Sequence, residues 1–78
     1  MSDEVIDALN QITAIVDEKA AKYKNEVRDM PRARALAEKQ MIIKLIDDGL
    51  NLAGQVQPKP ADLISDLGRL RDQLTNMA

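Results

Sequence analysis

Apolar residues recur every three or four positions from the start of the chain to a proline at position 31. They are Val5, Leu9, Ile12, Val16, Ala20, Tyr23, Val27 and Met30. This spacing places them on one narrow stripe of an α-helix, which Ala8 and Ile15 widen slightly. Ser2 has a hydroxyl that can cap the first free N–H groups. The pattern therefore predicts a first helix over residues 3–28.

Pro31 interrupts this pattern. Proline inside a helix removes a backbone hydrogen bond and clashes with the preceding turn, but it is accepted in the first turn of a new helix. Asp29 is a candidate cap for that second helix, and Gly54 a candidate left-handed stop at its end. We predict a second helix over residues 31–53 and a tight αα-hairpin, the alternative being one long helix kinked at the proline.

The second helix has an unusually wide apolar face. Its apolar positions are Leu36, Met41, Ile42, Ile43, Leu45, Ile46, Leu50, Leu52 and Ala53. At about 100° per residue they cover an arc of roughly 220°, against the ~100° stripe of an ordinary surface helix. Two explanations remain open. The helix touches two neighbours in a closed three-helix bundle, or part of its apolar face contacts another molecule.

The segment "GQVQPKP" over residues 54–60 reads as a linker, and Pro60 opens a third helix over residues 61–77. Leu63, Leu67, Leu70, Leu74 and Met77 follow a narrow four-three rhythm, and Gly68 lies outside it. This helix is too short to cover the whole hairpin. We predict one all-α domain over residues 1–78, a long αα-hairpin plus a shorter third helix, which associates into a dimeric helical bundle.

Composition strengthens the case for association. The chain has 78 residues, no Cys, no His and a single aromatic residue, Tyr23. A domain this small buries only about 60% of the surface of its unfolded chain, so its stability alone is marginal. Without cysteine for disulfides or histidine for a metal site, a partner subunit is the remaining common way to stabilise it.

Charge is segregated along the chain. Residues 1–18 carry a net charge of −5, residues 19–44 a net charge of +5, and residues 45–78 a net charge of −2. We expect the hairpin to bring five cations together at its tip: Lys22, Lys24, Arg28, Arg32 and Arg34. Cations near the end of the first helix suit its dipole, but Arg32 and Arg34 stand at the positive start of the second. Their position predicts an acidic protein partner, such as the first helix of an antiparallel second copy; the alternatives are a solvated bend or contact with nucleic acid.

The candidate chemistry is sparse. An enzyme working near neutral pH usually recruits histidine or a perturbed carboxylate, and here the carboxylates fall on polar helix faces. We therefore expect no enzyme activity, no cofactor, no metal and no small-molecule substrate. The acidic start lacks the features of a secretory signal, and no apolar run approaches the length of a membrane span. The expectation is a cytoplasmic protein with no membrane contact.

These observations predict a small protein–protein interaction module, an adaptor, assembly factor, chaperone or inhibitor of bacterial or phage type. The expected contact residues are the outer apolar arc of the second helix and the arginine tip, namely Met41, Leu45, Leu52, Arg28, Arg32 and Arg34. The expected partner is a protein, with a homodimer favoured. The alternative function is a small nucleic-acid-associated regulator that uses the basic tip, although five cations in an acidic chain make a small phosphate footprint.

Overall fold

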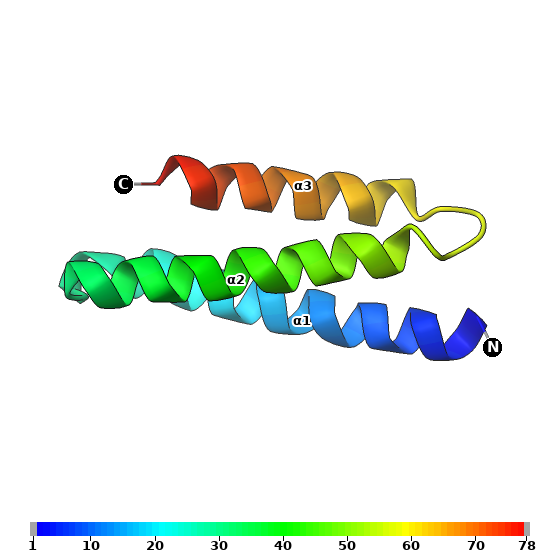
Figure 1. The fold of residues 1–78 in the computed structure, drawn as a ribbon, viewed down its shortest axis with the longest axis horizontal. Helices are drawn as coiled ribbons and strands as arrows, with labels where there is room; N and C mark the ends of the chain where they lie inside the picture. Colours follow the sequence, from blue (N-terminus) through cyan, green and yellow to red (C-terminus); the bar gives the residue numbers. More distant parts are fainter. Residues whose placement is uncertain (1, 78) are drawn as a thin grey trace.

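The computed structural model describes the backbone of residues 2–77 and the side chains of residues 4–77. Its elements are α1 (Ser2–Glu26), the short 3₁₀ helix η1 (Val27–Asp29), α2 (Arg32–Ala53) and α3 (Ala61–Asn76). α1 and α2 form an antiparallel hairpin, and α3 returns along α2 (Figure 1). The predicted all-α domain of three helices is confirmed. One end of the molecule holds the N-terminus and the linker, and the other holds the hairpin tip and the C-terminus.

The bend at Pro31 is a true hairpin and not a kinked helix. Met30 is extended (φ −86°, ψ 140°), and Pro31 is the N-cap residue of α2. The Pro31 carbonyl accepts a hydrogen bond from the Ala35 N–H at 2.9 Å. The expectation that Asp29 caps α2 is wrong, because proline disfavours helical geometry at the residue before it. The helix can therefore begin only beyond Met30, and Asp29 belongs to η1 instead.

The other helix ends differ slightly from expectation. Gly54 is right-handed (φ −65°, ψ −17°), so the predicted left-handed stop is wrong. The chain keeps turning beyond α2, with the Gln55 N–H donating to the Leu52 carbonyl at 2.9 Å and the Val56 N–H to the Ala53 carbonyl at 3.2 Å. This turn needs no positive φ. The predicted cap at Ser2 lies outside the described side chains.

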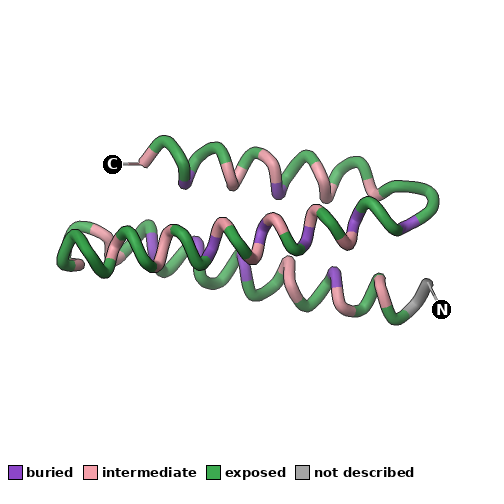
Figure 2. Tube along the Cα trace, viewed as in Figure 1, coloured by how far each residue is buried: buried purple, intermediate pink, exposed green. Residues whose placement is uncertain are grey.

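The core contains side chains from all three helices. Its main cluster comprises Val16, Ala20, Tyr23, Ile42, Ile46, Leu67 and Leu74, and a second cluster near the linker comprises Leu9, Ala53 and Val56. Buried positions follow the inward side of each helix (Figure 2). A Cβ atom at Gly49 would lie 3.2 Å from Ile12 Cγ2 and 3.3 Å from Leu67 Cδ1. The three helices therefore converge tightly at Gly49, and the bundle is closed there.

This closure explains most of the wide face of α2. α2 packs against both α1 and α3. The middle of the arc is buried in the core, and Leu45 and Leu52, next to its Met41 edge, are half-buried against the two core clusters. The two edges of the arc are different: Leu36 is 53% exposed and Met41 is 47% exposed. Contact with two neighbours in a closed three-helix bundle therefore explains the middle of the arc, and the edges at Leu36 and Met41 remain exposed.

The third helix stops short of the hairpin tip, as its length predicts. α3 has 16 residues against 25 in α1 and 22 in α2. Its C-terminal end falls short of the turn between α1 and α2 (Figure 1). The first turns of α2 are consequently almost free of buried residues (Figure 2). α3 therefore leaves the first turns of α2 at the hairpin tip uncovered.

Candidate protein-contact surface

Four of the six predicted contact residues lie on one face of α2. Arg34, Met41, Leu45 and Leu52 are separated by seven, four and seven residues. At about 100° per residue, they fall within roughly 40° of one another. Arg34 and Met41 are exposed, whereas Leu45 and Leu52 are half-buried. α2 therefore presents one continuous stripe, basic at the tip and apolar beyond it, which we call the outer stripe.

α1 adds one exposed residue to this side of the hairpin, Ile15, whose exposure the sequence pattern did not predict. Ile15 is 42% exposed, and it lies one turn nearer the tip than Ile12, which meets Gly49. In the antiparallel hairpin, Ile15 is therefore level with Leu45 and Ile46 of α2. From the sequence, the position of Ile15 predicts only a slightly wider apolar stripe on α1. Burial at that edge depends on how closely α2 approaches, which spacing within one helix does not show.

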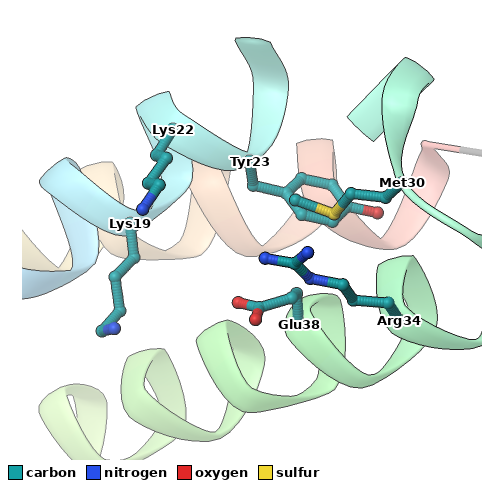
Figure 3. A pocket seen from close by; sticks show the side chains of 6 residues that line it. All are labelled: Lys19, Lys22, Tyr23, Met30, Arg34 and Glu38. Carbon is teal, nitrogen blue, oxygen red and sulfur yellow. The ribbon is translucent and has the colours of Figure 1, made fainter. Parts of the chain in front are cut away.

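A shallow cavity shows that α1 and α2 share this side of the hairpin. It has a volume of about 130 Å³ and is lined by Lys19, Lys22, Tyr23, Met30, Arg34 and Glu38. The two lysines come from α1, and Arg34 and Glu38 come from α2 (Figure 3). The opposite flank of α1 faces α3, because Lys24 Nζ donates to Gln73 Oε1 at 2.9 Å. We call the side away from α3 the outer face of the hairpin.

The five tip cations do not form a single patch. Lys22 and Arg34 line the outer-face cavity, whereas Lys24 binds Gln73 of α3. Arg32 lies nine residues before Met41, so it points to about the opposite side of α2. It lines a different cavity. Arg28 is exposed in η1. The expected convergence is therefore incomplete, since the cations spread over three sides of the tip.

The tip arginines are nevertheless available to a partner. Arg28, Arg32 and Arg34 are all exposed. Between residues 4 and 77, the two ion pairs are Arg69–Asp66 at 3.8 Å and Arg71–Asp47 at 2.8 Å, and neither involves these arginines. A guanidinium without an internal carboxylate partner keeps its donors for water or for another molecule.

A second hollow opens on the other side of the tip, where α3 ends. Its volume is about 320 Å³, and it is lined by Tyr23, Arg32, Ala35, Leu36, Lys39 and Met77. Lys39 Nζ donates to the Met77 carbonyl and ties the end of α3 to α2. Leu36 is the most exposed large apolar side chain among the described residues. The sequence placed Leu36 inside the wide arc and gave no sign that it would be left open.

Arg71, on α3, has a perturbed pKa, and its partner lies on α2. Arg71 Nε donates to Asp47 Oδ1 at 2.8 Å, which joins α3 to α2. That hydrogen bond and the charge of Asp47 raise the pKa of the Arg71 guanidinium above its ordinary value. This pair lies on the α3 side of α2, away from the outer stripe, and it helps to fix the third helix in place.

Two features are absent from the described part of the chain. Within it, no three or more His, Cys, Asp or Glu side chains are grouped so that they could hold a metal ion. None of the described helices combines the length and apolarity that crossing a membrane requires. Comparison of the chain with protein-family models, curated proteins and solved structures finds no match.

Proposed function

We propose that this protein is a non-catalytic protein–protein interaction module that binds its partner through the outer face of the hairpin. The observation that carries the proposal is the exposure of Met41 and Ile15, at 47% and 42%, on the same side of one small bundle. Large apolar side chains left open on the same face are typical of an association surface. An adaptor, assembly factor, chaperone or inhibitor would act in this way.

The outer face combines apolar side chains that a partner could bury with cations that could orient it. Burying a large apolar side chain completely is worth about 1.5–3 kcal/mol, so covering the exposed halves of Met41 and Ile15 would contribute about 1 kcal/mol each. Lys22 and Arg34 lie toward the tip from these two residues, and Lys19 lies about level with Met41. Their charge would attract and orient an acidic partner and raise the rate of encounter.

The nucleic-acid alternative has less support from this geometry. Non-specific affinity grows with the number of phosphates that a protein neutralises together. The tip cations point to three sides, and Lys24 is engaged with Gln73. Few of them could contact one strand at the same time. An acidic, apolar protein surface suits the outer face better.

Affinity capture from cell lysate with two matched variants tests the proposal. Met41→Lys places a charge on the outer face, while Ile6→Lys makes the same kind of change at a 38% exposed isoleucine whose direction on α1 is opposite to that of Ile15. We expect a specific protein band that Met41→Lys removes and Ile6→Lys retains. Equal capture by both variants would contradict the proposal.

The third variant replaces Arg28, Arg32 and Arg34 by Glu and is used in a gel shift with mixed DNA and RNA. We expect no retardation of nucleic acid by the unmodified protein at physiological salt. Retardation that grows as salt falls, and that disappears in the triple variant, would support the regulator instead.

A further inference from the structure

The hollow where α3 ends is the unfilled end of the groove that α3 occupies. Lys39 and Asp47 show which side of α2 faces α3, because each hydrogen-bonds a group of α3. At about 100° per residue, Arg32 and Leu36 point in directions between those of Lys39 and Asp47. They therefore face the path of the third helix, but α3 ends at Asn76 before it reaches them. The space that a longer third helix would fill stays open.

The apolar wall and the size of this hollow suit a small molecule. Leu36 is 53% exposed there, and Ala35 and Met77 are half-buried. Its volume of about 320 Å³ falls within the range of roughly 300–1,000 Å³ that is usual for small-molecule sites. A stable protein interface needs about 800 Å² from each partner, which a hollow of this size does not offer.

The polar wall of the hollow consists of cations. Arg32 is exposed, and neither ion pair among residues 4–77 involves Arg32 or Lys39. The Lys39 ammonium group has three N–H donors and gives one of them to the Met77 carbonyl. None of the residues that line the hollow is acidic, and Glu38 lines the outer-face cavity instead. The hollow therefore offers positive charge and free donors to an anionic group.

Tyr23 adds a buried hydroxyl to this wall. The residue is only 2% exposed, yet among residues 4–77 its hydroxyl hydrogen-bonds to no other side chain or backbone group. The hydroxyl of a buried tyrosine usually has a partner. The ring lies beside Met30, with the hydroxyl at its tip-side end (Figure 3). Since Tyr23 lines the hollow, a ligand there is a candidate for the missing partner.

We propose that this hollow binds a small aliphatic carboxylic acid. A guanidinium holds a carboxylate through two parallel hydrogen bonds, so Arg32 would receive the acid group. The alkyl chain would cover Leu36 and Met77, which an inorganic anion would leave exposed. The site is separate from the outer face and does not depend on the proposed function. The expectation of no small-molecule substrate came from the lack of catalytic groups, and binding requires none.

Octanoate is the probe, added to the unmodified chain while backbone amides are followed by nuclear magnetic resonance. We expect saturable binding at one site, with shifts concentrated at Tyr23, Leu36 and Lys39. Octan-1-ol has the same chain length without the charge and should bind at least about fivefold more weakly, because a hydrogen bond to a charged group is lost. Equal affinity for the two probes, no saturation, or shifts centred on Met41 and Ile15 would overturn the inference.

A pair of arginine variants tests the assigned role of Arg32. Arg32→Gln removes the charge at the hollow, and Arg28→Gln makes the same change at an exposed arginine of the tip that does not line it. Tyr23 is the single aromatic residue, so tyrosine fluorescence reports on this site alone. Arg32→Gln should weaken octanoate binding at least about fivefold, and Arg28→Gln should leave it unchanged. Equal weakening by both variants, or by neither, would refute the site, whereas protein capture by the outer face would be unaffected.

Discussion

Replacing each of two glycines by alanine tests how tightly α2 is held between its neighbours. Both Gly49 and Gly68 lie inside helices, where glycine is about 1 kcal/mol less favourable than alanine. A Cβ at Gly68 meets nothing within 4 Å, whereas a Cβ at Gly49 would lie 3.2 Å from Ile12 Cγ2 and 3.3 Å from Leu67 Cδ1. The same substitution therefore has different consequences at the two positions.

Gly68→Ala should raise the free energy of unfolding by about 1 kcal/mol, or roughly 4–8 °C in melting temperature for a domain of this size. At Gly49, overpacking costs about 1–3 kcal/mol and offsets or exceeds the same gain. Gly49→Ala should thus be at least about 1 kcal/mol less stable than Gly68→Ala.

Urea unfolding followed by circular dichroism measures this difference, with all proteins at one concentration because the proposed association would add to stability. If Gly49→Ala stabilised the protein as much as Gly68→Ala does, the close approach of the three helices at Gly49 would be wrong.

Three other predictions follow from the packing. Ile46→Ala, at a fully buried site, should cost about 2–5 kcal/mol in urea unfolding, whereas Leu36→Ala, at a 53% exposed site, should cost well under about 1 kcal/mol; equal losses would contradict the assigned core. Met41→Lys should leave the helical circular dichroism signal unchanged and weaken self-association measured by analytical sedimentation at least about tenfold, and an unchanged dissociation constant would count against the outer face. Because the folded pKa of Arg71 is raised, any stability from its pair with Asp47 is present below the ordinary arginine pKa and is lost only as pH rises through the raised value. The stability difference between the unmodified protein and Arg71→Gln should accordingly stay constant from neutral pH to about pH 10, and a difference that vanishes in this range would refute that assignment.

The helices themselves were predictable because their signals are local. The three-or-four spacing, Pro31 and the linker prolines place the bounds of α1, α2 and α3 within a few residues of those observed. The residues that end or cap the helices were harder to predict. Asp29 is a good capping residue in isolation, but the restraint that Pro31 imposes on Met30 takes precedence. Gly54 is a natural left-handed stop, yet the chain continues in right-handed turns toward the buried Val56.

The candidate contact surface was only partly predictable, because the exposure of a residue depends on the neighbours of its helix. The sequence predicted the width of the apolar arc on α2, but it did not predict which part of the arc α1 and α3 cover. Leu45 and Leu52 proved half-buried against the core, whereas Met41 and Leu36 stayed exposed at the edges. Ile15 joined the surface because the hairpin register brings it beside Leu45, and no pattern within α1 alone carries that information.

Sedimentation equilibrium of the unmodified chain beside Ile15→Glu tests the central claim most directly. At micromolar concentration, the unmodified protein should approach twice the 8.7 kDa mass of one chain. Ile15→Glu should sediment as a single chain with its helices intact, because it places a charge in the apolar part of the outer face. A single-chain mass for the unmodified protein across this range, or a dimer that Ile15→Glu leaves untouched, would contradict the account.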